Sequence, residues 1–340
     1  MLDNKTILIT GGTGSFGKRF IKTALEKYKP KKIIVYSRDE FKQYQMKESF
    51  KNKSIRYFIG DVRDVSRLEL AMENVDVVIH TAALKQVPAT EYNPFEAVKT
   101  NVIGAQNVIE AARKCNVKKI IALSTDKATA PINLYGATKL TSDKLFVSAN
   151  NYLNNKKIKL SVVRYGNVMG SRGSVIPFFL EEMKKNIFPI TDKKMTRFNI
   201  TLQHSVDFVL QCLNKMWGGE IFIPKIPSYR ILDLAKAISP NAKLRFVGIR
   251  PGEKLHEEMI TVSDSINTIE FDEYYVIFPN SIYLSWDIKD FIKKSNKKIG
   301  KYCKYGFSYA SNTNKDFLSV KEIRKLILDE VPGGKILDNL

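Results

Sequence analysis

The N-terminal segment constrains the fold most, because a short apolar strand leads directly into a glycine-rich turn and then into a helix. Residues Thr6–Thr10 read TILIT, and the turn that follows reads GGTGSFG. Glycine here permits a tight turn, a close approach of the backbone to a pyrophosphate, and close packing of the helix on the sheet. A glycine pattern alone is weak evidence, but this setting predicts a dinucleotide-binding turn formed by Gly11, Thr13, Gly14, Ser15, Phe16 and Gly17.

Short apolar runs alternate with helical stretches along the first half of the chain. The runs that read as further buried strands are Lys32–Ser37, Ile55–Gly60, Val75–His80, Lys119–Leu123 and Lys159–Arg164. Each intervening stretch is long enough for a right-handed βαβ crossover. The sequence therefore predicts an α/β fold with a Rossmann-type, doubly wound parallel sheet.

This alternation loosens after residue 167, where loop-like segments rich in anion-binding residues begin. Helices are predicted at Leu202–Met216 and Ile231–Ile238, and Glu220–Ile223 is predicted as the last strand. We expect a dinucleotide-binding domain of residues 1–167, continued by about 198–225. We also expect a smaller, interleaved C-terminal substrate-binding region, formed by residues 168–197 and 226–340. Beyond about Glu270 the sequence carries little functional signal.

The end of the second predicted strand bears on the choice of dinucleotide. NAD sites usually place a carboxylate there for the ribose hydroxyls, whereas this chain has Arg38, which suits the 2′-phosphate of NADP. Asp39 and Glu40 follow directly, so the residues favour NADP without excluding NAD. The remaining cofactor candidates are Lys42 and Gln43 on the next helix, Asp61 as an acceptor for the adenine amino group, and the small residue Ala82.

The stretch STDKATAPINLYGATK, which ends at Lys139, follows a strand end, where open α/β sheets bind their ligands. Asn133 is a candidate N-cap, and Tyr135 and Lys139 lie four residues apart on one face of the predicted helix. A cation beside a phenol favours the phenolate, so we expect Lys139 to lower the pKa of Tyr135 and make it a base. Asp126 and Lys127 add a carboxylate and an amine. An isolated Y-x-x-x-K is more often only a helix face, but the dinucleotide turn favours the catalytic interpretation.

Four other polar positions are informative. Lys85 follows the fourth strand and is placed to reach a substrate phosphate or hydroxyl, and Asn101 is a candidate for holding backbone through its amide. His80 is interpreted as a packed strand-end histidine rather than a catalyst. The turn Arg250–Lys254 suits a pyrophosphate or nucleotide, but a solvated basic turn explains these residues equally well.

Composition excludes some classes of protein. Hydrophobic content of 44% and charged content of 26% are ordinary for a globular chain, and no run approaches the ~20 apolar residues of a membrane helix. The N-terminus lacks signal-peptide anatomy, and three dispersed cysteines, Cys115, Cys212 and Cys303, lack metal-ligand spacing. We therefore predict reduced thiols, a cytoplasmic location, no membrane partner and no metal.

The net charge of +20 raises the question of nucleic acid as a partner. The excess is spread over short lysine pairs such as Lys31–Lys32 and Lys118–Lys119, and no recognisable nucleic-acid module surrounds them. We predict that no nucleic acid is bound, and that the positive field helps to attract a substrate that carries a diphosphate.

Several segments together resemble the extended short-chain dehydrogenase/reductase superfamily. The motifs are GGTGSFG, YSRDE, GDVRD, STDKA, NLYGATK, RYGNVMGSRGSV, PITD, MTRF and IRPGEKLHE, over about residues 2–310. Y-x-x-x-K identifies only the superfamily, whereas STDKA and IRPGEKLHE are typical of its nucleotide-sugar dehydratases. Within that group the chain is similar to the UDP-N-acetylglucosamine 4,6-dehydratases of the 5-inverting type, which serve pseudaminic acid biosynthesis and flagellin glycosylation.

The resemblance implies a role for each residue of the central stretch. Tyr135 would take the proton from the sugar O4 while tightly held NADP+ oxidises C4, and Lys139 would bind the nicotinamide ribose. Lys127 would remove the C5 proton, and Asp126 would protonate the departing 6-hydroxyl. Related sugar dehydratases mostly have an Asp-Glu pair where this chain has Asp126 and Lys127, so a lysine base distinguishes the group.

The resemblance also implies binding positions and an assembly. The cofactor would contact the residues named above together with Val62, Tyr135, Lys139 and Asn167, and UDP-N-acetylglucosamine would contact Lys85, Thr125, Asn167, Val175, Thr191, Met195, Arg197, Arg250 and Glu253. A homo-oligomer is expected. Gln86 stands where relatives often have His, and Asn199 where they often have Trp, which leaves the identity of the sugar less certain than the chemistry.

Two other functions compete with this one. A retaining dehydratase or a nucleotide-sugar 4-epimerase could use the same scaffold, but an epimerase needs no acid–base pair for dehydration. A non-enzymatic Rossmann protein that only holds NADP often lacks the Tyr–Lys pair, which this chain retains. Product analysis distinguishes all of these.

Overall fold

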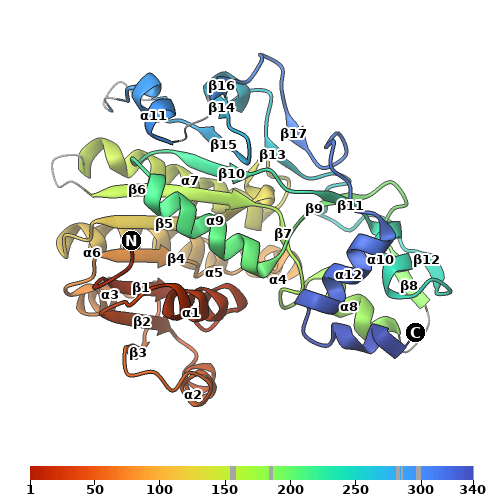
Figure 1. The fold of residues 1–340 in the computed structure, drawn as a ribbon, viewed down its shortest axis with the longest axis horizontal. Coiled ribbons are helices and arrows are strands. Elements are labelled where there is room, and N and C mark those ends of the chain that lie inside the picture. Colours follow the sequence, from red (N-terminus) through yellow and green to blue (C-terminus); the bar gives the residue numbers. More distant parts are fainter. Residues whose placement is uncertain (154–157, 184–186, 281–283, 285, 296–299, 340) are drawn as a thin grey trace.

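A computed structural model describes residues 1–153, 158–183, 187–280, 284, 286–295 and 300–339 (Figure 1). Its largest feature is a sheet of ten strands in the order β16-β14-β15-β10-β6-β5-β4-β1-β2-β3. From β3 to β10, each strand in this row pairs in parallel with its neighbours. The order 3-2-1-4-5-6 is that of a Rossmann fold, so the predicted doubly wound parallel sheet is confirmed.

Where the sheet is parallel its strands are short, mostly apolar and largely buried, except for the edge strand β3, in which Arg56 and Ile59 are exposed. The bounds of the strands in the large sheet are β1 Thr6–Thr10, β2 Lys32–Ser37, β3 Ile55–Ile59, β4 Val77–His80, β5 Lys119–Thr125, β6 Lys159–Tyr165, β10 Ile221–Pro224, β14 Thr268–Glu270, β15 Tyr274–Ile277 and β16 Lys301–Tyr302. The smaller sheets use β7 Asn167–Val168, β8 Ile187–Ile190, β9 Thr196–Ile200, β11 Ser228–Arg230, β12 Lys243–Phe246, β13 Glu258–Ile260 and β17 Tyr309–Ala310.

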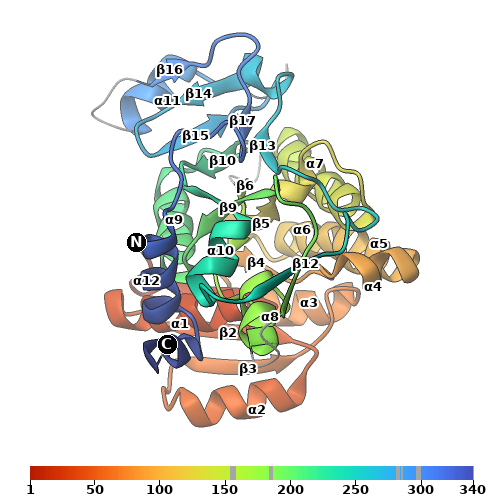
Figure 2. The same ribbon diagram turned by 90° about the vertical axis from the view of Figure 1, so that its right-hand side faces the viewer.

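Helices cover both faces of the large sheet. In Figure 2, α1 and α9 lie on one side of the strands, and α3, α6 and α7 lie on the other. The bounds of the helices are α1 Ser15–Lys27, α2 Glu40–Ser49, α3 Val65–Met72, α4 Val87–Tyr92, α5 Pro94–Val98, α6 Gly104–Lys114, α7 Leu134–Leu153, α8 Val175–Glu182, α9 Leu202–Lys215, α10 Ile231–Ile238, α11 Ile288–Ser295 and α12 Val320–Glu330. None of the helices in the described part of the chain is both long and apolar enough to cross a membrane.

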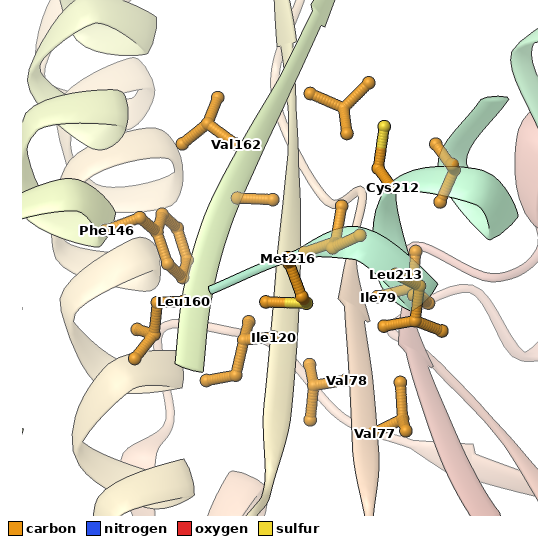
Figure 3. Close-up of a cluster of buried hydrophobic side chains, with 14 of the residues drawn as sticks. Val77, Val78, Ile79, Ile120, Phe146, Leu160, Val162, Cys212, Leu213 and Met216 are labelled. Carbon is orange, nitrogen blue, oxygen red and sulfur yellow. The ribbon is translucent and has the colours of Figure 1, made fainter. Parts of the chain in front are cut away.

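The core between these layers is mainly apolar, with a few buried polar side chains such as Asp143, Arg164 and Glu220. Figure 3 shows its centre, where Phe146 of α7 packs against β6 and residues of α9 such as Leu213 approach β4 and β5. Val77, Val78 and Ile79 of β4 are all at most 5% exposed. Because both faces of the parallel strands are covered, these strands are continuous apolar runs rather than alternating ones.

Two regions differ from the sequence-based expectation. Glu220–Ile223 is not the last strand, because the apolar run Tyr274–Ile277 pairs antiparallel with β10 and β14 and β16 follow it outward. Strands β14, β15 and β16 thus extend the large sheet, whereas the predicted domain bounds assign them to the substrate-binding region. Segments predicted as loops at 189–192 and 195–198 fall partly within β8 and β9, since short strands with polar residues lack a clear apolar alternation.

A second hydrophobic cluster lies beyond the carboxyl ends of the central strands. It is formed by α8, α10, α12 and β8, with Phe179, Phe188, Leu234 and Ile327 almost completely buried. Figure 1 shows these elements on the right, opposite the glycine-rich turn and the ends of β4 and β5. The cleft between this cluster and the sheet contains the candidate site.

Candidate active site

A cavity of about 980 Å³ lies at the carboxyl ends of β1, β2, β4, β5 and β6. Its other wall comes from residues 166–181, 189–197 and 250–257. This is the crevice in which open α/β sheets bind their ligands. Its volume is large for a small-molecule pocket and suits two ligands side by side.

The glycine-rich turn fits the pyrophosphate of a dinucleotide. A Cβ on Gly11, whose φ is +65°, would lie 2.9 Å from Thr81 Oγ1, and one on Gly17 would lie 2.3 Å from the carbonyl oxygen of Gly12. Gly14 is the N-cap of α1 and makes no side-chain capping hydrogen bond. The first N–H groups of α1 therefore face the cavity without a side chain to accept from them, which is the arrangement that binds phosphate at a helix N-terminus.

The adenosine end of the cavity is bordered by cations. Arg38 and Lys42 line it, and Arg38 lies 3.7 Å from the carboxylate of Asp61. Arg172 enters from the opposite wall, and burial together with the charges of Arg172 and Lys42 lowers the pKa of Lys18. No role was assigned from the sequence to Lys18 or to Arg172, although Arg172 lies in the segment RYGNVMGSRGSV, because the approach of their charges joins segments far apart in the chain.

Three of the predicted cofactor residues do not line this cavity. Asp39 instead caps α2, its carboxylate accepting from the backbone N–H of Lys42 at 2.9 Å. The side-chain amide of Gln43 donates to the carbonyl oxygens of Ser37 and Phe58, and Glu40 lies in the first turn of α2. The remaining predicted cofactor positions border the cavity, as do all the predicted substrate positions.

The segment that carries Lys85 is held from behind by a π-helical turn, Lys99–Ile103. Asn101 in this turn is 1% exposed, accepts from the backbone N–H of Leu84 at 2.8 Å and donates to its carbonyl oxygen at 2.8 Å. The predicted backbone-holding role of Asn101 is therefore confirmed. Lys85 lines the cavity, and burial and the charge of Lys127 lower its pKa.

Helix α7 presents Tyr135 and Lys139 to the cavity. Its start is capped by Asn133, whose Oδ1 accepts from the backbone N–H of Gly136 at 2.7 Å. The ammonium of Lys139 donates to the carbonyl oxygen of Leu123 at 2.8 Å, and burial lowers its pKa. The predicted cap and the shared helix face are both confirmed.

The expected effect of Lys139 on Tyr135 needs correction. Burial raises the pKa of Tyr135 to about 12, and the cation that opposes this rise is Lys127, helped by a hydrogen bond from Thr125. Burial removes the phenolate from water, and this outweighs the neighbouring charges of the chain itself. His80, by contrast, is packed as expected: it is 1% exposed, its Nδ1 lies 2.8 Å from Thr10 Oγ1, and burial lowers its pKa to about 3.

Lys127 lies between two carboxylates. Its Nζ is 3.1 Å from Asp126 Oδ1 and 3.0 Å from Glu257 Oε1, and it also approaches Asn167 Oδ1 at 3.5 Å. Burial alone would lower the pKa of Lys127, but the charges of Asp126 and Glu257 raise it above its usual range. Lys127 is therefore an ammonium in the free protein. It lines the cavity together with Tyr135.

Asp126 lies beneath the cavity wall rather than on it. It is 0% exposed, and one of its oxygens, Oδ2, makes no hydrogen bond. Its Oδ1 accepts from Thr125 Oγ1 at 3.0 Å, and Thr125 lines the cavity. Burial raises the pKa of Asp126 against the pull of Lys127, which favours the protonated acid.

Arg197 connects this cluster to the RPGEKLHE segment. It is 5% exposed, and its guanidinium donates to the carbonyl oxygens of Thr196 and Leu255 and contacts Glu253 Oε1 at 3.3 Å. The same segment is fixed to the start of α7, because Asn133 Nδ2 donates to the carbonyl oxygen of Gly252 at 2.7 Å. The predicted substrate residues thus adjoin the predicted catalytic ones. Within the described residues, no group of three or more His, Cys, Asp or Glu is arranged to hold a metal ion.

Glu257 is the main residue that sequence reasoning missed. It closes the IRPGEKLHE motif but received no role, because its contact with Lys127 joins segments 130 residues apart. Its backbone N–H donates to Ser311 Oγ at 2.9 Å, and Ser311 N–H donates back to its carbonyl oxygen at 2.8 Å. The C-terminal part therefore contributes to the site, although the sequence beyond residue 270 gave no such indication.

Comparison with known proteins places these features in a family. A family model described as "Polysaccharide biosynthesis protein" matches residues 7–279. The chain is 56% identical over 329 residues to the UDP-N-acetylglucosamine 4,6-dehydratase (inverting) of Campylobacter jejuni, covering 96% of this chain and 98% of the relative. It is 41% identical to a UDP-glucose 4-epimerase of Rickettsia bellii, covering 97% of each.

A solved structure supports the same relationship. The X-ray structure of Pen from Bacillus thuringiensis is similar to this chain with a TM-score of 0.86 and 39% identity. The match covers 97% of this chain and 98% of the other. Both the sheet and the second cluster therefore have counterparts in a protein of known structure.

Proposed function

Since this chain belongs to the polysaccharide biosynthesis protein family, within the short-chain dehydrogenase/reductase fold, we propose that it is a UDP-N-acetylglucosamine 4,6-dehydratase that inverts C5. The product would be UDP-2-acetamido-2,6-dideoxy-β-L-arabino-hex-4-ulose, formed by loss of one water without net oxidation. The reaction is that of a hydro-lyase. Substrate and product differ at C4, C5 and C6 of the sugar only.

One observation supports this function most strongly. Lys127 and Tyr135 line the same cavity, and Lys127 is hydrogen-bonded to the carboxylic group of Asp126 at 3.1 Å. A sugar oxidised at C4 has an acidified C5–H, so a base at C5 and an acid at O6 complete the elimination. A simple dehydrogenase or epimerase needs only the tyrosine and its lysine.

Each chain residue has a defined proton to hold or move. Tyr135 removes the proton of the sugar O4, and Lys139 beside it orients the cofactor ribose. Lys127, as the free amine, removes the proton from C5, and Asp126 supplies the proton with which the 6-hydroxyl leaves as water. Asp126 is buried, and the Thr125 hydroxyl, which donates to its Oδ1 at 3.0 Å, lies between it and the cavity. A bound nicotinamide dinucleotide supplies the oxidant at C4 and the reductant at C6.

Mass spectrometry and NMR together test the assignment. Purified protein incubated with UDP-N-acetylglucosamine should give a product lighter by one water, and in deuterated water NMR should show deuterium at C5 with inverted configuration. A product of unchanged mass that is epimeric at C4 would identify an epimerase, which is the function of the Rickettsia relative. A dehydrated product with retained C5 would identify a retaining dehydratase. Unchanged sugar with bound dinucleotide would favour a non-enzymatic protein.

The cofactor is proposed to be NADP rather than NAD. Support comes from Arg38, Lys42 and Arg172 on the cavity wall and from Asp39, whose carboxylate is used as the cap of α2. A 2′-phosphate gains charge-assisted hydrogen bonds from such a cationic border. Releasing the bound nucleotide from purified protein and identifying it by chromatography tests this proposal, and recovery of NAD alone would contradict it.

Three further expectations remain proposals. We expect a homo-oligomer, a cytoplasmic protein, and a place at the start of pseudaminic acid biosynthesis. The cysteines Cys115, Cys212 and Cys303 are free thiols, which agrees with a reducing compartment. Light scattering tests the first expectation, cell fractionation the second, and loss of pseudaminic acid from flagellin after gene deletion the third.

A further inference from the structure

Two carboxylates contact the same ammonium group, but they come from different parts of the chain. Asp126 belongs to the turn after β5 and neighbours Lys127 in sequence, whereas Glu257 precedes β13 (Glu258–Ile260). Their distances to Lys127 Nζ are nearly equal, 3.1 Å and 3.0 Å. The elimination described above needs one carboxylic acid, so the second carboxylate requires its own explanation.

The surroundings of the two carboxylates differ in charge. Glu257 Oε1 also lies 3.8 Å from the guanidinium of Arg197, and Glu257 is 2% exposed. Burial alone would raise the pKa of Glu257, but Lys127 and Arg197 hold it below its usual value. Asp126 has no guanidinium partner among the described residues. Burial raises the pKa of Asp126, and the negative charge of Glu257 raises it further. Glu257 is thus the more acidic carboxyl group of the pair, and Asp126 is the one that holds a proton more readily.

We propose that Glu257 is the counter-ion of Lys127 and a positioning residue for the elimination. Its fixed negative charge stabilises the ammonium that Lys127 becomes when it takes the C5 proton. It also leaves Asp126 free to stay protonated until the 6-hydroxyl departs. This inference deepens the proposed function and rests on it for the identity of the reaction.

The charges balance in this scheme. Lys127, an ammonium in the free protein, first releases one proton to the solvent of the cavity that it lines. The C5–H bond then breaks and an N–H bond forms on the free amine. The electron pair of C5–H becomes the C5–C6 double bond, while Asp126 gives its proton to O6 and the C6–O6 bond breaks to release water. The pair Lys127–Asp126 thereby changes from neutral and neutral to cation and anion. Because Glu257 keeps its charge throughout, it stabilises the cation formed at this step more than the neutral amine before it.

Several charged or titratable groups besides Glu257 face Lys127. Asp126 favours the ammonium, and Arg197 disfavours it. The charge of Lys127 also lowers the pKa values of three other titratable groups near it, Lys85, Tyr135 and Tyr229. Of the two carboxylates that contact Lys127, Asp126 is its neighbour in sequence and belongs to the same turn. Glu257 lies on a different segment, so it can be substituted without altering the turn that carries Lys127.

The backbone of Glu257 is held by the C-terminal segment. Ser311 exchanges two hydrogen bonds with it, and Ser311 Oγ also lies 2.7 Å from Thr196 Oγ1, next to Arg197 in sequence. Strand β17 (Tyr309–Ala310) pairs antiparallel with β13 and brings Ser311 to this point. A residue whose backbone and charged end are both fixed is suited to keep Nζ of Lys127 in one place.

Chemical labelling tests the charge relationship without any turnover. Lys127 is 24% exposed toward the cavity, so an acylating reagent reaches it, and peptide mass spectrometry reports its labelling as a function of pH. Only the free amine reacts, so Glu257→Gln should lower the labelling midpoint of Lys127 by about one pH unit or more. Glu257→Asp keeps the charge and should restore most of the shift. Glu258→Gln makes the same change one residue along and should leave the midpoint in place.

Turnover provides the second readout. In Glu257→Gln, kcat for dehydration should fall about 10-fold or more, KM for UDP-N-acetylglucosamine should stay within about threefold, and the acidic limb of the pH profile should move to lower pH. A labelling midpoint and an acidic limb that both stay in place in Glu257→Gln would overturn the proposal, as would equal loss in Glu257→Gln and Glu257→Asp. Failure of the wild-type protein to release water from the sugar would instead contradict the proposed function, while the labelling result still decides the role of Glu257.

Discussion

The two lysines of the central stretch, Lys127 and Lys139, are only twelve residues apart in sequence, but their side chains lie in environments of different charge and burial. Lys127 is partly exposed in the cavity and contacts two carboxylates, whereas Lys139 is 4% exposed and donates to the carbonyl oxygen of Leu123. The pKa of Lys127 is raised by its carboxylates, and that of Lys139 is lowered by burial. A shared residue type thus serves two different tasks, and the neighbouring charges determine which.

The comparison also separates two ways of building a site. The surroundings of Lys139 come from strand β5 and helix α7, which are close in sequence and pack against each other. The surroundings of Lys127 come from its own turn, from β9, from the segment before β13, and through Ser311 from the C-terminal part. The proton transfer proposed at C5 would therefore depend on contacts between distant segments, whereas the proposed orientation of the cofactor would depend mainly on local ones.

The largest effect is expected from Lys127→Ala. Removing the amine takes away the base proposed for C5, and the carboxylate of Glu257 that contacts it is a much weaker base, so dehydration should fall by about 10²–10⁴-fold or become undetectable. Oxidation at C4 should persist more slowly, because Tyr135 and Lys139 remain but the charge of Lys127 no longer opposes the rise in the pKa of Tyr135. Product mass measures dehydration, and the absorbance of the reduced dinucleotide measures oxidation at C4. Lys144→Ala, an exposed position on α7, serves as the control, and retained dehydration in Lys127→Ala would refute its role as the base.

Lys→Met substitutions at the two positions should change stability in opposite directions. Lys127→Met leaves Glu257 buried without its ammonium partner and should lower the free energy of unfolding by ~2 kcal/mol, allowing for partial exposure. Lys139→Met removes a charge whose burial is unfavourable and should raise it by ~1 kcal/mol, minus part of one hydrogen bond. Urea denaturation at neutral pH measures both. Equal destabilisation of the two variants would show that their environments do not differ as described.

Asn133 tests the connection between the two environments. Its side chain caps α7 and also holds Gly252, so Asn133→Ala should cost ~1 kcal/mol of stability and raise KM for the nucleotide sugar several-fold. Ser319→Ala removes the cap of α12 and should cost a similar amount of stability while leaving KM unchanged. Thermal unfolding and steady-state kinetics on both variants check this. An unchanged KM in Asn133→Ala would show that the Gly252 contact does not position the substrate segment.

The smallest effect is expected from Ser311→Ala. Loss of the hydrogen bond to the backbone of Glu257 should loosen the carboxylate and lower kcat about threefold, or ~0.6 kcal/mol in activation free energy. The acidic limb of the pH profile should stay in place, because no charge is removed. Steady-state kinetics across pH measures both quantities, and a shifted limb would argue that Ser311 affects the charge of Lys127 directly.

The parts of the site that could be predicted from the sequence are the local ones, and the parts that could not are those built from distant segments. The glycine turn, Tyr135, Lys139 and the Asn133 cap were predictable, because each depends on residues adjacent in sequence and on one strand or helix. The position of Glu257 opposite Lys127 was not, because it depends on the pairing of β13 with β17. The rise in the pKa of Tyr135 was missed for a related reason, since burial results from the whole fold and not from one neighbour.

The fold was predicted to the same extent. The parallel strands are continuous apolar runs and were recognisable, whereas β14 and β16 have three and two residues and no distinctive pattern. Their place at the sheet edge comes from antiparallel pairing with β15, which sequence alone does not specify.

The hydrogen bonds between Ser311 and Glu257 have a consequence for synthesis on the ribosome. A nascent chain that has folded as far as residue 300 already contains the glycine turn, α7 and Lys127, but it lacks the strand that anchors Glu257. Such a chain contains the segments of the proposed dinucleotide site but not the contacts that hold the backbone of Glu257. We therefore expect the cofactor site to form earlier during synthesis than the complete surroundings of Lys127.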